Sequence, residues 1–273
     1  MNILLELDGR PVIAHRGGRA RAPENTLQAM QLAIASGADG LEFDVRLSAD
    51  GEVVVIHDPT VDRTTDGTGA VERMTLAELK SFDAGFRFST RPLDPVSTIQ
   101  HRIPTLDEVL RSFPGVPLLI EIKTLLAASA TRRLIEQHGA EDWCLVDSFS
   151  TTTLNVFRDS RIARGLGRSG VIGLLARLFT RAPSPIPAAV SALSIPRAYY
   201  GVPLPVRLLA GAMRSARKPT HIWTVNDPNE ACAMWGLGAT GMITDDVPVI
   251  LAARSRMIEP SAEVGMDSNA QAG

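Results

Sequence analysis

The sequence predicts an α/β protein with the fold of a TIM-type (β/α)8 barrel, and three observations lead to this prediction. Short β-branched runs alternate with helix-like segments along almost the whole chain. Most of these runs are apolar throughout, which is typical of parallel strands covered by helices on both faces of a sheet. Eight or nine such strands in roughly 250 residues suit a closed barrel better than an open sheet.

The expected elements follow one another as β-α units. The expected strands are Val12–Ala14, Gly40–Val45, Val53–Ile56, Leu118–Ile122, Leu145–Asp147, Ile162–Leu166, Ala192–Ile195, Ile222–Val225 and Gly241–Thr244. Segments with apolar residues at helical spacing lie between most of them, namely Thr26–Ala35, Leu106–Phe113, Thr131–Gln137 and Pro228–Trp235. This order of strands and helices is the one that a barrel requires.

Two regions depart from the alternation. Residues 59–104 hold many turn residues and one expected helix, Thr75–Lys80, and they are too long for an ordinary barrel loop. Residues 259–273 are small and polar, so we expect a flexible C-terminal tail there. We therefore predict a single catalytic barrel over residues 1–258, with residues 59–104 as a small insertion after the second strand region.

Composition narrows the class of protein. The chain has 273 residues, of which 45 % are hydrophobic and 21 % charged, as expected for a globular protein with a large core. A formal net charge of −2 argues against a general nucleic-acid binder. The first residues lack a basic region before an apolar run, and no uncharged run reaches transmembrane length. We therefore expect a cytoplasmic protein.

Polar side chains gather where the expected strands end. They are His15 and Arg16 after the first strand, Glu42 and Asp44 in the second, His57 after the third, and Glu121 and Lys123 at the end of the fourth. Residues two apart in a strand point the same way, so the pairs in the second and fourth strands each share a face. Because barrel active sites lie at the carboxyl ends of the strands, we expect all these side chains to converge.

The residue types at this end of the barrel indicate phosphoester chemistry. Glu42, Asp44 and Glu121 in one cavity would repel one another unless a cation lies between them. A hard divalent ion with oxygen ligands, Mg²⁺ or Ca²⁺, is the simplest solution, and no Cys–His spacing indicates zinc. Two histidines nearby suit an acid/base pair, and Arg16 and Lys123 suit an anionic group such as a phosphate. This set predicts cleavage of a phosphoester without a protein nucleophile.

The same residues belong to an ordered set of motifs. In chain order these are His15-Arg16-Gly17, Pro23-Glu24-Asn25-Thr26, Glu42-x-Asp44, His57-Asp58, Arg63-Thr64-Thr65 with Gly67 and Gly69, Glu121-x-Lys123, and Trp223-Thr224-Val225-Asn226. From about Pro11 to Val249 the set resembles the glycerophosphodiester phosphodiesterase family. The resemblance implies a TIM-type barrel with a family-specific insertion in its second βα connection. It also implies hydrolysis of a glycerophosphodiester to an alcohol and glycerol 3-phosphate.

The resemblance further implies a role for each matching position. Glu42, Asp44 and Glu121 match metal ligands, His15 and His57 match catalytic histidines, Arg16 and Lys123 match phosphate contacts, Trp223 matches an aromatic wall beside the alcohol, and Glu24 and Asn25 match residues near the metal. On general grounds alone, Trp223 would be a core residue and Asp58, which precedes Pro59, a turn former. Residues 161–218 lack strong family motifs, so the identity of the substrate is least defined there.

Several alternatives stay open. A lysophospholipase D-type or related phospholipase-like diesterase would act on a lipid-tailed glycerophosphodiester. A Mg-dependent enolising barrel enzyme would use Lys123 as its base, but it would leave the two histidines and Arg16 without a joint role. A phosphate-binding barrel without catalytic activity would need no acid/base pair. The residues do not decide which histidine is the base, or whether water or the 2-hydroxyl of the substrate attacks.

Charge is unevenly distributed along the chain. Residues 160–226 contain no Asp or Glu, yet they hold Arg161, Arg164, Arg168, Arg177, Arg181, Arg197, Arg207, Arg214, Arg217 and Lys218. The same stretch contains apolar runs such as 171–175. Basic residues interleaved with apolar ones can dock on an anionic membrane surface. The general expectation is ordinary outer helices that carry solvated arginines, and the alternative hypothesis is peripheral contact with an anionic membrane through residues 161–218.

Overall fold

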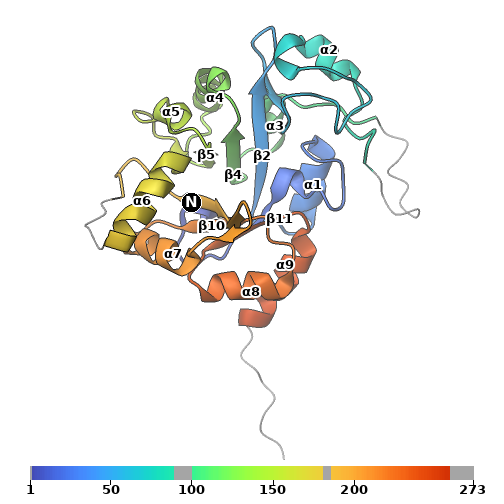
Figure 1. The fold of residues 1–273 in the computed structure, drawn as a ribbon. Coiled ribbons are helices and arrows are strands. Elements are labelled where there is room, and N and C mark those ends of the chain that lie inside the picture. The colour runs from blue at the N-terminus through green and yellow to red at the C-terminus, as the bar shows by residue number, and fades with distance from the viewer. Residues whose placement is uncertain (1, 89–99, 181–185, 259–273) are drawn as a thin grey trace, which may run out of the picture.

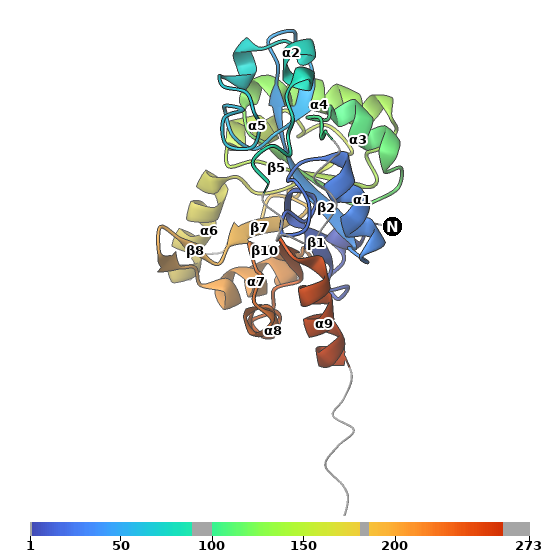
Figure 2. The same ribbon diagram turned by 90° about the vertical axis from the view of Figure 1, so that its right-hand side faces the viewer.

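The eight parallel strands of a TIM-type barrel form the centre of the molecule, as the sequence predicts (Figures 1 and 2). The computed structural model describes residues 2–88, 100–180 and 186–258. In sheet order the strands are β6 (Ala163–Arg164), β5 (Cys144–Asp147), β4 (Leu118–Ile122), β2 (Gly40–Leu47), β1 (Val12–Ala14), β11 (Gly241–Thr244), β10 (Thr220–Trp223) and β7 (Leu193–Pro196). The two ends of the sheet meet where Ser191 N–H donates to the Arg164 carbonyl at 2.8 Å.

Helices surround this sheet (Figures 1 and 2). They are α1 (Leu27–Ala35), α3 (Leu106–Ser112), α4 (Leu125–Gln137), α5 (Thr151–Asn155), α6 (Arg168–Thr180), α7 (Val206–Ser215), α8 (Pro228–Gly236) and α9 (Val247–Ile258), with a short β8–β9 hairpin (Ala198–Tyr199, Val202–Pro203) before α7. The helix α4 begins earlier than its predicted start at Thr131, because the buried alanines of its first turns give a weak apolar signal. None of the helices within the described residues is long and apolar enough to cross a membrane.

One predicted barrel strand is wrong. Residues Val53–Val55 form β3, which pairs with β2 in antiparallel orientation as a hairpin and not as a parallel barrel strand. A run of three valines has the same apolar pattern in both settings. The missed signal is the Asp50-Gly51 pair, with a φ of 86° at Gly51, which is typical of a hairpin turn.

The chain therefore leaves the barrel at the end of β2, before residue 59, where the predicted insertion begins. It returns to the barrel at the start of α3. This excursion contains β3, the 3-10 helix η3 (Val71–Arg73) and α2 (Leu76–Ser81), close to the predicted helix Thr75–Lys80. It has a small apolar cluster of its own, which includes Val54, Val61 and Leu79. The predicted domain limits stay a prediction, and residues 259–273 lie outside the described part of the chain.

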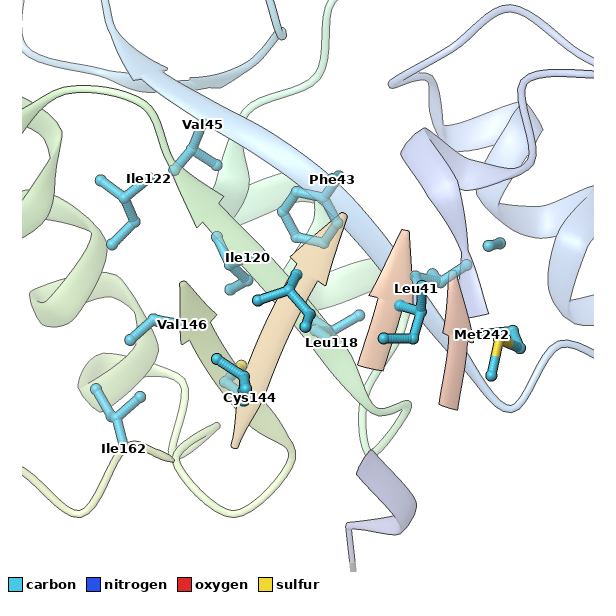
Figure 3. Close-up of a cluster of buried hydrophobic side chains, with 14 of the residues drawn as sticks. Leu41, Phe43, Val45, Leu118, Ile120, Ile122, Cys144, Val146, Ile162 and Met242 are labelled. Carbon is cyan, nitrogen blue, oxygen red and sulfur yellow. The ribbon is translucent and has the colours of Figure 1, made fainter. Parts of the chain in front are cut away.

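Alternate residues of the barrel strands face opposite sides of the sheet. Leu41, Phe43 and Val45 of β2 lie in the large apolar cluster, together with Leu118, Ile120 and Ile122 of β4 (Figure 3). A separate cluster inside the barrel contains Leu4 of η1 (Ile3–Leu5), Ile13, Leu119, Leu145, Ala163, Ala192 and Ile243. This inner cluster fills the barrel and leaves the carboxyl ends of the strands for polar residues.

A polar layer lies directly above the inner cluster. On five strands, the residue two positions after the inner apolar residue is polar, namely His15, Glu121, Asp147, Ser194 and Asp245. Four of the five, His15, Glu121, Asp147 and Ser194, line one cavity at the carboxyl end of the barrel, and Asp245 pairs with His15 there. The alternation of the strands thus separates a filled apolar interior from a polar mouth.

Candidate active site

A cavity of about 320 Å³ lies at the carboxyl ends of the barrel strands. Its wall includes seven of the predicted site residues, namely His15, Arg16, Glu42, His57, Glu121, Lys123 and Trp223. Asp44 lies behind this wall and is only 1 % exposed. The fold therefore brings together residues from both ends of the sequence, as the carboxyl-end argument predicts.

Three carboxylates form an acidic cluster in this cavity. Glu42, Asp44 and Glu121 each offer an oxygen, and these oxygens lie within 4.8 Å of one another. The parallel pairing of β2 with β4 places Asp44 directly opposite Glu121. Burial, and then the Asp44 carboxylate, raise the pKa of Glu42 to about 7. The cluster thus brings three carboxylates together in a largely buried place, and its hard oxygen donors fit a divalent metal ion.

Asp44 is the centre of the charged network. The ammonium of Lys123 lies 2.8 Å from Asp44 Oδ1 and 2.8 Å from Glu121 Oε1. Asn25 donates to Asp44 Oδ2 at 3.0 Å, and Arg16 Nε lies 3.4 Å from the same oxygen. Burial would raise the pKa of Asp44, yet Lys123 and Arg16 keep it below its ordinary value. Asp44 is therefore ionised and lies beside Asn25, whose place near a metal stays a prediction.

A tight turn after β1 positions Arg16. Arg16 has a φ of 52°, in the left-handed region that residues other than glycine rarely adopt. The turn directs the backbone N–H of Arg16 to Glu42 Oε2 at 2.9 Å. Gly17 follows with a φ of 79°, and a Cβ there would lie 3.0 Å from the backbone nitrogen of Met30. Such strained residues cluster at ligand-binding sites, where the surrounding structure holds them in place.

Each of the two histidines is paired with an aspartate. His15 Nδ1 lies 2.6 Å from Asp245 Oδ1, and His57 Nδ1 lies 2.6 Å from Asp58 Oδ1. A carboxylate on one ring nitrogen fixes the orientation and the tautomer of a histidine. In both pairs Nε2 is therefore the nitrogen left to meet a substrate. The interpretation of Asp58 as a turn former was too narrow, because its carboxylate holds His57.

The two pairs differ in their support. Asp245 also accepts hydrogen bonds from Arg19 Nε at 2.8 Å and Asn226 Nδ2 at 2.9 Å. Despite the opposing effect of burial, His15 and Arg19 hold the pKa of Asp245 well below its usual range. Asp58 is supported instead by Arg63, a residue of the excursion between β2 and α3. The His15 pair thus rests on the barrel, whereas the His57 pair rests on the excursion.

The environment of the His57 pair shifts both of its pKa values downward. Burial opposes ionisation of Asp58, but the hydrogen bonds from Arg63 and His57 lower its pKa to about 2. Burial also lowers the pKa of His57, although the Asp44 carboxylate acts in the opposite direction. Neutral His57 beside ionised Asp58 is therefore the favoured state near neutral pH.

Glu24 joins the excursion to the turn after β1. Arg63 donates to its two carboxylate oxygens at 2.9 and 2.7 Å, and Arg16 donates to Oε1 at 2.9 Å. Although burial opposes ionisation, Arg63 and Arg16 lower the pKa of Glu24. Glu24 therefore lies between two arginines and contacts the acidic cluster through Arg16, and its place near a metal stays a prediction.

Two aspartates of the cavity region escaped the sequence analysis. Asp245 follows the last barrel strand as His15 follows the first, so the carboxyl-end rule applied to β11 would have found it. Asp147 ends β5 and lines the cavity. Burial, and then the Glu121 carboxylate, raise the pKa of Asp147 to about 8. Both residues stand at strand ends, which was the available signal.

Comparisons with known proteins agree with this geometry. Residues 15–249 match the model of the glycerophosphoryl diester phosphodiesterase family. A glycerophosphodiester phosphodiesterase of Caldanaerobacter subterraneus subsp. tengcongensis is 35 % identical over 247 residues, which cover 88 % of this chain and 96 % of the relative. A relative from Bacillus subtilis, described as a putative glycerophosphodiester phosphodiesterase, is 32 % identical over 86 % of this chain and 93 % of its own.

A solved structure is also similar. An Oleispira antarctica phosphodiesterase in complex with the product sn-glycerol-3-phosphate matches with a TM-score of 0.72 and 28 % identity, over 90 % of this chain and 96 % of that chain. The family match covers more than half of this chain, and residues from most of the motifs that carried the resemblance line the cavity. The chain therefore belongs to the glycerophosphoryl diester phosphodiesterase family, and it is a phosphoric diester hydrolase of glycerophosphodiesters.

Proposed function

We propose that this chain hydrolyses a glycerophosphodiester to an alcohol and glycerol 3-phosphate in a metal-dependent reaction at the cavity described above. One observation carries the proposal: the acidic cluster and the two paired histidines lie in or directly behind the wall of one cavity. The Oleispira relative, which binds the product sn-glycerol-3-phosphate, supports the identity of the product.

In this proposal Glu42, Asp44 and Glu121 hold one divalent cation, Mg²⁺ or Ca²⁺, because both ions prefer oxygen ligands. When bound, such a cation supplies Lewis acidity toward a phosphoryl oxygen and offsets the charge of the three carboxylates. Arg16 and Lys123 provide fixed positive charge for the phosphate oxygens. Lys123 suits this role and not that of a base, since Asp44 and Glu121 overcome the effect of burial and raise its pKa. This argues against the enolising alternative.

The two histidines move protons in the proposed reaction. One takes a proton from the attacking hydroxyl at Nε2, and the other gives a proton to the oxygen of the leaving alcohol. Asp245 and Asp58 keep the rings oriented and stabilise the imidazolium form. Trp223 contacts Phe149 edge to face, with ring centroids 5.9 Å apart, and forms an aromatic wall beside the alcohol.

A direct assay tests this proposal. Purified protein is incubated with glycerophosphocholine, and choline and glycerol 3-phosphate are measured with and without EDTA. We expect both products to form, EDTA to abolish their release, and added Mg²⁺ or Ca²⁺ to restore it. Release that EDTA leaves unchanged would contradict metal dependence. No release from glycerophosphodiesters with several different head groups would contradict the diesterase itself and favour a phosphate-binding barrel.

Peripheral membrane contact is a finer part of the proposal. Three of the predicted basic residues pair with carboxylates: Arg161 with Glu141, Arg197 with Glu230, and Arg214 with Asp8. Arg164 and Lys218 donate to backbone carbonyls, and Arg181 lies outside the described residues. Exposed Arg168, Arg177 and Arg207 on α6 and α7 support a smaller contact surface than residues 161–218 as a whole.

A further inference from the structure

A second cavity adjoins the active site. It has a volume of about 280 Å³ and lies between α6, the end of β7 and the segment that precedes α7. Its wall shares five residues with the catalytic cavity, namely Glu121, Asp147, Phe149, Ser194 and Trp223. We call this second cavity the α6 pocket. Because the two cavities have a common boundary, a group attached to a phosphodiester at the acidic cluster can extend directly into the α6 pocket.

The α6 pocket is aliphatic beyond this boundary. Its further lining consists mainly of Leu166, Val171, Ile172, Leu175, Ile195 and Leu204. Among the described residues that line this part, Arg168 alone is charged, and its exposed guanidinium lies over the ring of Tyr199, 5.1 Å from the centroid. A polar alcohol placed here would lose hydrogen bonds to water without replacement, whereas a hydrocarbon chain would gain from burial.

The packing of α6 explains why this space exists. Of its thirteen residues only Leu174 is buried, although the helix is rich in apolar side chains. Ile172 and Phe179 are 57 % and 71 % exposed. A barrel helix normally buries a broad apolar stripe against the sheet, whereas α6 stands beside α7 at the edge of the barrel (Figure 1). Ile172 lines the pocket and is exposed, so the pocket opens to solvent at this residue and a longer chain can continue outward.

We propose that the α6 pocket binds an aliphatic chain of the substrate, so that the preferred substrates are glycerophosphodiesters that carry one hydrocarbon chain. This inference rests on the proposed function, since the phosphate must lie at the acidic cluster for the chain to reach the pocket. The hydrocarbon chain of the substrate takes part only in binding. In the net reaction the oxygen of one water becomes bonded to phosphorus, and the bond between phosphorus and the oxygen of the leaving alcohol breaks. The chain can be carried by the glycerol, as in a monoacyl glycerophosphodiester, or by the leaving alcohol.

Substrate pairs that differ only in the chain test this inference. The first pair is glycerophosphocholine and its 1-octanoyl derivative, and the second is glycerophosphoethanol and glycerophospho-octanol, all below their micellar concentrations. Each buried methylene contributes a factor of about four, so we expect at least a tenfold higher kcat/KM in at least one pair. The pair that shows the gain identifies whether the glycerol or the alcohol carries the chain.

Two variants of α6 sharpen the test. Ile172→Glu places a carboxylate in the wall of the α6 pocket and not in the wall of the catalytic cavity. It should remove the gain from the octyl chain and leave the chainless substrates within about twofold, because burying a charge opposes binding of the chain. Phe179→Glu is the matched control, since it makes the same change of charge on an exposed residue of α6 that does not line the pocket.

The outcomes separate this inference from the proposed function. A gain from the chain that Ile172→Glu removes and Phe179→Glu keeps would support the α6 pocket. Hydrolysis of the chainless substrates without any gain from the chain would overturn the inference alone. Equal losses on both members of a pair in Ile172→Glu would also overturn it. Hydrolysis of none of the four substrates would overturn the proposed function, and the inference with it.

Discussion

The two halves of the barrel mouth are built differently. The half formed by β1, β2, β4 and the excursion is a network of charges, in which Arg16, Arg63 and Lys123 each pair with carboxylates. The half formed by β5 to β10 and α6 contains the aliphatic α6 pocket. In the proposed function, the charged half binds what all glycerophosphodiesters share, namely the phosphate and the scissile bond. In the further inference, the α6 pocket binds the rest of the substrate, so that the residues for reaction and for specificity would be separated in space.

The largest effect is expected from breaking the charged half at Glu42. Glu42→Gln keeps the size of the side chain but removes a charged ligand. Activity at limiting metal should therefore fall by at least 100-fold, which is more than the usual loss when a residue that hydrogen-bonds a metal ligand is replaced. Glu52→Gln, on an exposed glutamate of the turn between β2 and β3, is the control and should have no effect. Activity of Glu42→Gln within about threefold of the unchanged protein would exclude Glu42 as a ligand.

The same variant should change the pH dependence of stability. In metal-free protein the pKa of Glu42 is raised to about 7, from about 4.5 in the unfolded chain. The unfolded state loses this proton first, so stability is lost as the pH rises from about 4.5 to about 7. Glu42→Gln lacks this loss and should be more stable at pH 8, by up to about 3 kcal/mol. Denaturant unfolding in EDTA measures the free energy of unfolding of both proteins at each pH. If this free energy changed with pH in parallel for the two proteins, the prediction would be contradicted.

An effect of similar size is expected at the two histidines. His15→Ala and His57→Ala should each lower kcat by about 10²–10⁴-fold with metal affinity nearly unchanged. The double variant should lose much less than the product of both, because residues that act as a unit are not additive. His138→Ala, which breaks a pair with Asp107 away from the cavity, is the control. Near-normal turnover of either single variant would remove that histidine from the reaction.

A smaller effect is expected when Asp58, which pairs with Arg63 of the excursion, is replaced. Asp58→Asn removes a carboxylate that raises the pKa of His57, which burial already lowers. We expect about 10–100-fold lower kcat, the usual cost of losing an orienting partner. The unchanged protein should show a bell-shaped pH profile of kcat/KM, and in this variant the limb that reports His57 should move to lower pH.

The shift in the pH profile separates an electrostatic role from a merely structural one. Asp62→Asn is the control, because Asp62 is exposed, accepts a hydrogen bond from the backbone N–H of Gly69 and does not line the catalytic cavity. A loss of kcat in Asp58→Asn without any shift of the limb would mean that Asp58 holds the loop and does not tune His57.

The charged half was the more predictable one, for a physical reason. Its residues sit within or directly after apolar strands, where a polar side chain such as Glu42 or Glu121 has few structural uses. Asp245 could have been found from its place at the end of β11, but its pairing with His15 could not, because only closure of the barrel brings β1 beside β11. The antiparallel β3 was missed because the apolar pattern of a strand does not state the direction of its partner.

The apolar half was hidden for a different reason. In sequence, Val171 and Leu175 of α6 have the spacing of a helix that packs against a barrel, and a cavity leaves no mark on such a pattern. The hypothesis of a membrane-contacting surface over residues 161–218 was drawn from the basic and apolar residue types of this stretch. In the structure the side chains of Arg164 and Lys218 donate hydrogen bonds to backbone carbonyls. The residue type alone does not show whether an arginine or lysine is used in this way.

The smallest effect is expected at the outer surface of the apolar half. Arg177 lies exposed on α6, the helix that carries the exposed apolar residues Ile172 and Phe179. If this surface contacts a membrane, binding to anionic vesicles should be weak, exceed binding to neutral vesicles, and fade between low and physiological salt, because screening shortens the range of surface charge. Each basic residue near such a surface contributes about 1 kcal/mol, so Arg177→Glu should lower co-sedimentation several-fold. Arg111→Glu, the same change at an exposed arginine of α3, should leave co-sedimentation unchanged. Equal binding of the protein to anionic and neutral vesicles would show that the arginines of this half are ordinary solvated residues of an outer helix.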